Sequence, residues 1–363
     1  MERRGVLKAS LATTVAAAAG SVALAAPAIS QNRQEIILAT TWPRDFPGVG
    51  TGAQRFADRV TRASGGRMLV RLYAAKELMP AFDVFDAAAA GDIHMYHGAE
   101  YYWQEKSKAY NFFAAVPLGL TASEFDAWIN HAGGQELWDE LSAAHNIKPL
   151  PCGNTGVQMA GWFREEITSV DDLKGLTMRI PGLGGEVIRA AGANTISTPG
   201  GEIMTAFEDG RINAAEWIGP WNDLALGLYK VARYYYYPGL HEPGSARSLG
   251  INLDFWNGLP SEDRQIILDA AASENNYMLS EFNAHNGRAM QELIELHGVQ
   301  IRRMERVVFR ELALAARDVV ADAGNQGNLA RRIYNSFLKF QKEVGSWTEL
   351  SEQAYVEARA RYI

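Results

Sequence analysis

Apolar and polar positions in the first part of the chain predict an alternation of strands and helices. Residues 35–39 form a short apolar run typical of a buried strand, and from Ala53 apolar residues recur at helical spacing until Gly65. The same reasoning predicts strands at 67–73 and 93–96 and a helix at 82–90. This β-α-β-α-β order favours a mainly parallel sheet covered by helices.

The pattern continues into a second α/β unit that begins near residue 153. A long helix is predicted over 123–145. Strands are predicted at 147–151, 153–163, 176–180 and 249–253. A second long helix is expected to start after Pro260, with Ser261 as its N-cap and acidic residues in its first turn.

The chain after residue 305 has a helical pattern throughout. One apolar stripe consists of Val308, Leu312, Ala315 and Val319, and another of Leu329, Ile333, Phe337, Phe340 and Val344, which Gly345 is expected to break. We therefore predict two α/β lobes with a helical tail. Lobe I comprises residues 31–152 and 248–300, lobe II comprises 153–247, and the C-terminal helical extension comprises 301–363.

Residues 1–30 are predicted to be an export signal. Arg3 and Arg4 precede an Ala-rich, weakly hydrophobic stretch that ends in small-residue cleavage options, and this combination favours the twin-arginine route. An uncleaved membrane anchor is the alternative, but Pro27 and the short apolar part argue against it. No later segment approaches about 18 uninterrupted apolar residues, so we expect a soluble periplasmic protein.

Composition and charge mainly exclude classes of partner and of metal site. The 363 residues carry a formal net charge of −7, and removing the signal, with its three basic residues and one acidic residue, makes it −9. Without a long basic run, nucleic acid is not an expected partner. Cys152 is the only cysteine, which excludes an internal disulfide and a cysteine-based zinc cluster. The scattered histidines contain no HExxH motif, which disfavours a zinc hydrolase.

Arg179 is the sharpest functional signal, because it is a single charge inside an otherwise apolar strand. Burying a guanidinium without a partner is costly, so such an arginine normally has an anion beside it. Its planar fork suits a carboxylate in a bidentate contact. The residues alone leave two interpretations equal, a ligand site or a structural salt bridge to Asp171 or Asp172.

Glu216 has a similar setting, since it lies beside Trp217 among small and apolar residues. A carboxylate of this kind is paired with a basic residue or binds a cation, and composition alone favours the ion pair. Gln158 could offer a neutral oxygen to the same cation, or it could be a core amide satisfied by the backbone.

Aromatic residues crowd positions 101–103 and 234–237. Either run could wall a small-ligand pocket, although packing between lobes is the preferred interpretation for most of them. Signals of catalysis are thin, because the sequence contains no GxSxG, Walker A or GxGxxG motif.

Residues 171–182 (DDLKGLTMRIPG) resemble the signature of the solute-binding proteins of TRAP transporters, the DctP family. Residues 199–217 (PGGEIMTAFEDGRINAAEW) continue the resemblance, while 153–159 (GNTGVQM) and 234–239 are similar to the branch that binds 2-oxo acids and lactate. The resemblance implies a type II periplasmic-binding-protein fold, with two lobes around a ligand cleft and a helical C-terminal extension.

The same resemblance implies how a ligand would be held. A monocarboxylate would be bound by Arg179, with Asn154 and one of Tyr101 and Tyr102 in contact with it. A cation, Na+ or alternatively Ca2+, would be bound by Gln158, Glu216, the Trp217 carbonyl and Glu242. Some relatives have a bulky aromatic residue where His241 falls, so the exact acid stays open.

The leading function is a non-catalytic binder that delivers its ligand to TRAP membrane permease subunits. A metal-dependent enzyme acting on a 2-oxo acid is the second hypothesis, for which His241 is the one candidate acid or base. A subunit that presents the ligand to a sensor is the third. We also expect a homodimer in which Leu329, Ile333, Phe337 and Phe340 face the partner; the alternative is a tail that folds back on its own protomer.

Overall fold

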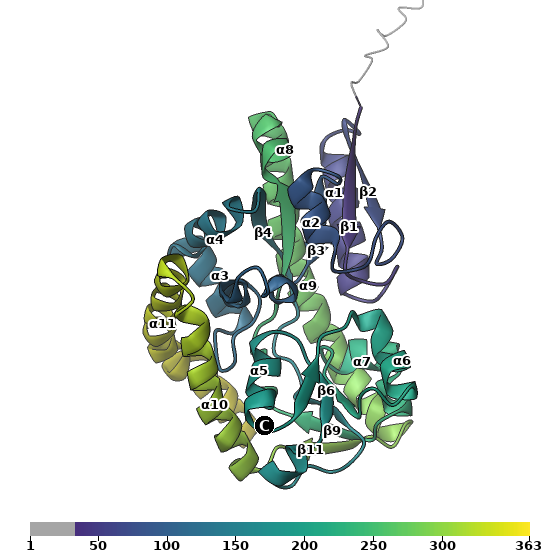
Figure 1. Cartoon of the computed structure of the whole chain (residues 1–363), viewed down its shortest axis with the longest axis vertical. Helices are drawn as coiled ribbons and strands as arrows, with labels where there is room; N and C mark the ends of the chain where they lie inside the picture. Colours follow the sequence, from purple (N-terminus) through teal and green to yellow (C-terminus); the bar gives the residue numbers. More distant parts are fainter. Residues whose placement is uncertain (1–32) are drawn as a thin grey trace, which may run out of the picture. The chain divides into compact units, whose positions relative to one another are not determined.

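The computed structural model describes residues 33–363, so the predicted signal peptide lies outside the described residues. Two sheets organise the described chain (Figure 1). The first, sheet A, has the strand order β2-β1-β3-β10-β4. Its strands are β1 (Gln34–Thr40), β2 (Met68–Tyr73), β3 (Met95–Gly98), β4 (Ile147–Asn154) and β10 (Ala246–Asn252).

Sheet A is mixed, which corrects the expectation of a mainly parallel sheet. Strand β1 pairs in parallel with β2 and β3, through the crossover helices α1 (Val49–Ala63) and α2 (Val84–Ala90). Strand β10 returns from a distant part of the sequence and runs antiparallel to both β3 and β4. All seven residues of β10 are buried, and the strand lies inside the sheet between β3 and β4.

Sheet B has the order β11-β9-β5-β8-β6-β7. Its strands are β5 (Gly161–Phe163), β6 (Thr177–Arg179), β7 (Asn194–Ile196), β8 (Ala214–Ala215), β9 (Tyr234–Tyr237) and β11 (Gln300–Arg303). Strand β11 pairs in parallel with β9, so residues 300–303 belong with sheet B. The tyrosine run is β9, and Tyr235 and Tyr236 fill the core of sheet B.

One helix accompanies both sheets. Helix α9 (Ser261–Glu295) packs against α1 and β4 and farther along against α7 (Pro220–Leu226), so it links the two sheets (Figure 1). Its N-cap is Pro260 and Ser261 is the first helical residue, so the helix begins one position earlier than predicted. A short helix, α8 (Leu253–Gly258), precedes it.

Two further predictions need correction. The stretch predicted as one helix is two, α3 (Ala122–His131) and α4 (Gly134–Ala143), because Gly133 adopts a left-handed conformation with φ of 82°. Residues 155–160 form a loop between β4 and β5, where we predicted a continuous strand. Gly156, with φ of 70°, provides the turn in this loop.

The C-terminal part is helical, as predicted, in α10 (Arg306–Gly324), α11 (Asn328–Thr348), the π-helical turn η6 (Glu349–Gln353) and α12 (Ala354–Tyr362). Helix α11 runs through Gly345, which therefore does not break it. Ile333 and Phe337 are buried in this protomer's own core, where Phe337 contacts Phe112 and Trp128. The prediction that Leu329, Ile333, Phe337 and Phe340 face a partner is therefore wrong, since two of them are buried in this core and the other two, Leu329 and Phe340, are partly buried against it.

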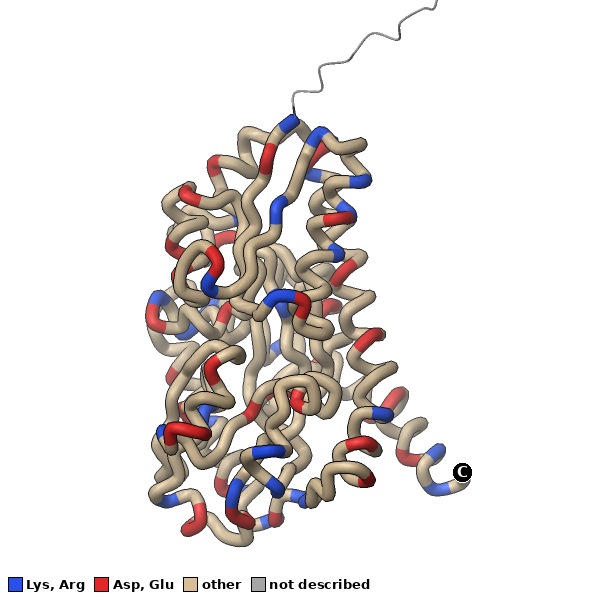
Figure 2. The backbone as a smooth tube through the Cα atoms, turned by 90° about the vertical axis from the view of Figure 1, so that its right-hand side faces the viewer, with Lys and Arg blue, Asp and Glu red and all other residues tan. Residues whose placement is uncertain are grey.

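Basic and acidic residues are interspersed along the described chain in the view of Figure 2. Within residues 33–363, no helix is both long and apolar enough to cross a membrane.

Candidate functional site

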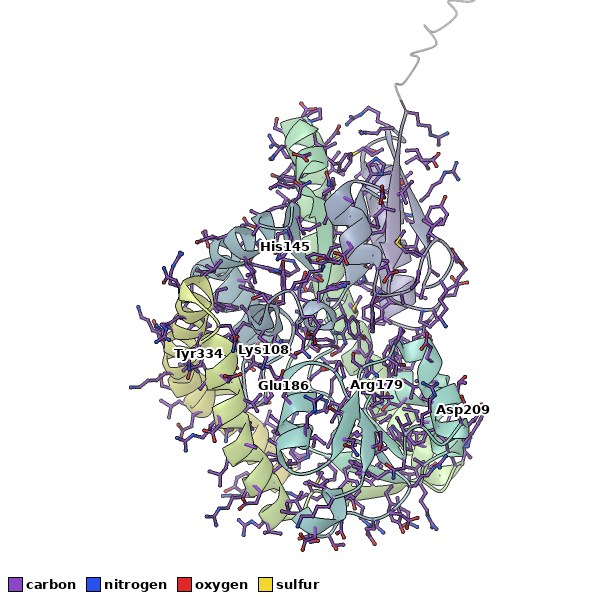
Figure 3. The ribbon with its side chains drawn as sticks, viewed as in Figure 1. Lys108, His145, Arg179, Glu186, Asp209 and Tyr334 are labelled. Atoms are coloured by element: carbon purple, nitrogen blue, oxygen red, sulfur yellow. The ribbon has the colours of Figure 1, made fainter. Side chains whose placement is uncertain are left out.

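The sequence-predicted polar residues meet where strand ends of the two sheets approach each other; Figure 3 shows Arg179 between the sheets. Sheet A supplies Asn154 at the end of β4, and sheet B supplies Arg179 at the end of β6 and Glu216 after β8. Loops supply the others. We call the whole set the central cluster: Asn154, Gln158, Arg179, Glu216, Trp217, His241 and Glu242, all of which are buried.

Arg179 and Glu216 are each other's ion-pair partner. Strand β6 pairs in parallel with β8, which places Arg179 opposite Ala215 and next to Glu216. The Arg179 Nη1 donates to Glu216 Oε1 at 2.6 Å and to the Glu216 carbonyl at 3.0 Å, while Nε donates to the Thr198 carbonyl at 3.0 Å. The alternative partners predicted for Arg179 are engaged elsewhere: Asp171 pairs with Lys174, and Asp172 caps a turn at Ser169.

The ion pair does not satisfy the whole guanidinium. Arg179 Nη2 is buried and has no hydrogen-bond partner among the described residues. Trp217 lies under the Arg179 guanidinium, 5.3 Å from it to the ring centroid. Gly200 makes room for that ring, because a Cβ there would lie 2.1 Å from a Trp217 carbon. This close approach explains a glycine of the 199–217 motif.

Glu216, His241 and Glu242 form a compact group whose ligand atoms all lie within 4.8 Å of one another. His241 Nε2 lies 3.3 Å from Glu216 Oε2. Burial and then the charge of Glu216 raise the pKa of Glu242. Burial lowers the pKa of His241, but the hydrogen bond and charge of Glu216 outweigh that effect and raise it. Two neighbouring buried carboxylates favour a positive charge between them.

Several polar atoms of this cluster lack partners among residues 33–363. Gln158 donates its amide nitrogen to Thr155 Oγ1 at 2.9 Å, which leaves its Oε1 unpaired, and Glu242 Oε2 is also unpaired. Asn154 accepts a hydrogen bond from the Gly156 amide at 2.9 Å, which leaves its Nδ2 unpaired. Buried polar atoms are normally satisfied, so a group of free acceptors beside free donors indicates a polar ligand.

Tyr101 and Tyr102 lie at the cluster in the short helix η1 (Glu100–Trp103) after β3. Tyr102 stacks on Phe82, with ring centroids 4.4 Å apart. Tyr101 accepts a hydrogen bond from Nη1 of Arg247 on β10, at 3.3 Å. Sequence reasoning missed Arg247, which is buried beside the cluster, because the strand that carries it was predicted to begin at 249.

Outside the cluster, Lys108 joins elements on both sides of it. The short helix η2 (Lys108–Phe113) carries this lysine, whose Nζ binds Glu186 of α5 (Gly182–Ala190) at 2.9 Å and Asp322 of α10 at 3.1 Å (Figure 3). In addition, Asn111 Oδ1 accepts from the Leu183 amide at 3.0 Å. These contacts hold the sheet A side against the sheet B side in the present conformation.

Comparison with known proteins shows the family of this chain. Residues 38–325 match the family model DctP, described as bacterial extracellular solute-binding protein, family 7. A monocarboxylate 2-oxoacid-binding periplasmic protein of Nostoc sp. is 38% identical over 88% of this chain and 87% of its own.

Two solved structures are also similar. A TRAP periplasmic solute-binding protein of Pseudoalteromonas atlantica, with bound sodium and pyruvate, has a TM-score of 0.87 and 37% identity over 90% of this chain and 99% of its own. A TRAP transporter solute-binding protein of Bordetella bronchiseptica, a dimer with calcium and picolinate at one active site, has a TM-score of 0.88 and 32% identity over 91% of this chain and 99% of its own.

Proposed function

Because this chain belongs to family 7 of the bacterial extracellular solute-binding proteins (DctP), we propose that it captures a small 2-oxo or 2-hydroxy monocarboxylate together with a cation and delivers them to a TRAP membrane permease. The observation that carries the proposal is the central cluster, where unpaired acceptors of Gln158 and Glu242 lie with an unpaired donor of Arg179. One cluster thus offers both a cation site and an anion site.

The donor set fits a hard cation. Na+ and Ca2+ take oxygen ligands, and Glu216, Glu242 and the free Oε1 of Gln158 supply them, with the Trp217 carbonyl as a further ligand. A cation there would offset the repulsion between the two carboxylates. When bound, it would supply a positive charge for the ligand's oxygens.

The ligands bound by the similar structures are acids that can chelate a cation. Pyruvate and picolinate share a carboxylate with a neutral donor atom on the adjacent carbon, so each can chelate a cation through both. In the present chain, the donors left free for the carboxylate are Arg179 Nη2 and Asn154 Nδ2, and Tyr101 or Tyr102 would complete the contact. Cation and acid would therefore bind together.

Isothermal titration of pyruvate tests the proposal, with protein freed of metal by chelation and then supplied with Na+ or Ca2+. We expect binding only with a cation, loss of binding in Glu242→Gln, and normal binding in the matched control Glu166→Gln, whose carboxylate pairs with exposed Arg302. Full binding by metal-free protein would refute cation-assisted capture. The proton NMR signal of pyruvate should stay unchanged over hours, since we propose capture without turnover.

We also propose a homodimer, formed through the end of the chain. Residues 347–363 leave large apolar side chains exposed, with Trp347 68% and Leu350 77% accessible, and α12 points away from the rest of the described chain (Figure 2). Covering such a surface with a second copy would bury apolar area that a monomer leaves in water. Light scattering should give twice the monomer mass, and Leu350→Asp should lower it; a wild-type monomer at micromolar concentration would refute the dimer.

Export by the twin-arginine route is the last part of the proposal, and it rests on Arg3 and Arg4. Arg3→Lys with Arg4→Lys should leave the protein unexported, as measured by periplasmic fractionation. Export of that variant at the wild-type level would contradict the route.

A further inference from the structure

Two arginines are buried among residues 33–363, and their partners differ. Arg179 and Arg247 are each 1% exposed. Arg179 is bonded to the Glu216 carboxylate at 2.6 Å. Within the described chain, no carboxylate lies within 4.0 Å of the Arg247 guanidinium, and its Nε has no partner. Arg247 Nη1 has neutral partners, Ser245 Oγ at 2.8 Å and the Tyr101 hydroxyl at 3.3 Å.

Arg247 is therefore the buried guanidinium of the described chain that has no carboxylate at bonding distance. Burying a guanidinium with neutral partners alone is unfavourable, so its presence indicates an anion that is bound during function. Arg179 has less need of one, because Glu216 already neutralises it. The two arginines thus have separate roles.

An aromatic stack fixes Arg247 relative to Arg179. The Arg247 guanidinium lies 5.2 Å from a Trp42 ring centroid, Trp42 meets Trp217 edge-on at 6.2 Å, and Trp217 lies 5.3 Å from Arg179. His97 holds Trp42 in place, since its Nδ1 accepts from Trp42 Nε1 at 2.7 Å and its Nε2–H donates to the Cys152 carbonyl at 3.0 Å. Arg247 therefore packs on a tryptophan that is itself held by a buried hydrogen bond.

We propose that Arg247 is a carboxylate-binding residue of this site and sets its preference for an ionised acid over a neutral analogue. This inference rests on the proposed function. The ligand's carboxylate lies against Arg247 and the free Nη2 of Arg179, and Arg179 also positions Glu216 for the cation. Two arginines and two glutamates balance in charge, so a monocarboxylate with a monovalent cation keeps the buried site neutral.

The inference is tested on the full-length protein by removing the charge of Arg247, of the ligand, or of both, and comparing the affinities. Pyruvate and its neutral amide, pyruvamide, are titrated into wild type, Arg247→Gln and the control Arg302→Gln, with saturating Na+. In Arg247→Gln, pyruvate affinity should fall at least tenfold and the pyruvate-over-pyruvamide preference should narrow by about the same factor. The control Arg302→Gln should leave both unchanged, because Arg302 pairs with Glu166 at the surface.

Further outcomes separate this inference from the proposed function. Calcium binding without ligand should be nearly unchanged in Arg247→Gln. It should be weaker in Arg179→Gln, because Glu216 then loses the hydrogen bond from Arg179 that positions it for the cation. A wild type that binds no pyruvate with any cation would overturn the proposed function. A wild type that binds, together with an unchanged preference in Arg247→Gln, would overturn the inference alone.

Arg247→Lys decides the matter if Arg247→Gln does not fold. This variant keeps the positive charge and the alkyl stem but loses the planar fork. Pyruvate affinity should fall several-fold, and wild-type affinity in Arg247→Lys would overturn the inference.

Discussion

Arginines meet buried glutamates in two regions of this molecule, and the two regions differ in how completely their polar atoms are satisfied. In the first region, which we call the α1–α9 network, Arg55 of α1 meets Glu274 and Glu281 of α9. Arg55 donates to both oxygens of Glu274, at 2.7 and 3.1 Å, and to both oxygens of Glu281, at 2.7 and 3.2 Å. In the central cluster, by contrast, Arg179, Gln158 and Glu242 each keep an unpaired polar atom.

This difference teaches how to separate a structural ion pair from a binding site. Burying charge costs free energy in both regions. In the α1–α9 network, hydrogen bonds within the fold offset this cost, because Arg55 donates to both oxygens of each of the two carboxylates. The central cluster leaves donors and acceptors unsatisfied, and only a bound ligand and cation can satisfy them. Burial of charge alone does not identify a site, whereas unpaired buried atoms of both kinds do.

The largest expected effect comes from breaking the α1–α9 network. Arg55→Met leaves Glu274, whose side chain is fully buried, without its guanidinium, and should lower the free energy of unfolding by about 3–5 kcal/mol at pH 8. Arg44→Met is the matched control, because Arg44 and Glu77 form an exposed pair that contributes at most about 1 kcal/mol. Urea denaturation measures both, and equal losses would contradict the distinction between them.

Glu100 tests whether an unpaired buried oxygen by itself indicates a ligand site. Its Oε2 is unpaired, as in the central cluster, but no arginine of the described chain is bonded to it. Burial raises the pKa of Glu100 to about 7, against the lowering effect of hydrogen bonds from Tyr96 and Ser248. The folded state therefore keeps a proton that the unfolded state releases near pH 4.5, so stability is present below that pH and is lost as the pH rises through 7. Below pH 7 its unpaired atom then belongs to a neutral acid, which needs no bound cation to balance it.

The measurement is chemical unfolding of Glu100→Gln at pH 5 and pH 8. Because glutamine cannot ionise, the variant should gain about 3 kcal/mol of stability relative to wild type between pH 5 and pH 8. Only the interval from pH 5 to the folded-state pKa of about 7 contributes, at about 1.4 kcal/mol per pH unit. A difference between wild type and Glu100→Gln that is the same at both pH values would show that Glu100 does not titrate in this range.

The sequence predicted the elements that local pattern controls. The apolar run at 35–39 became β1, and the stripes after residue 305 became α10 and α11. It missed the break at Gly133, where backbone conformation overrides a continuous helical pattern, and the antiparallel position of β10, which depends on pairing with strands about 100 residues or more away.

The site was predictable in part for the same reason. Arg179 and Glu216 stood out because each is one charge among apolar residues, but their mutual ion pair follows from the register between β6 and β8, which no local pattern contains. Arg247 was missed because the predicted strand began three residues after the true start of β10 at Ala246. Arg247 therefore fell outside the predicted strand.

The smallest effect, and the most direct test of the central cluster, is stabilisation by ligand. A ligand that binds only the folded state at about 100 times its Kd adds about 2.7 kcal/mol to the free energy of unfolding. Pyruvate with Na+ should produce this gain in wild type and none in Glu242→Gln, because that variant loses the charge that holds the cation.

Without ligand, Glu242→Gln should be at least as stable as wild type, since it removes the repulsion between Glu216 and Glu242 that helps to raise the pKa of Glu242. This behaviour is the opposite of Arg55→Met, where stability falls and nothing bound can restore it. Urea denaturation with and without pyruvate and Na+ compares the two variants. If Glu242→Gln gained as much from pyruvate as wild type does, the unpaired oxygen of Glu242 would have no role in binding, and the central cluster would be a structural network like the one between α1 and α9.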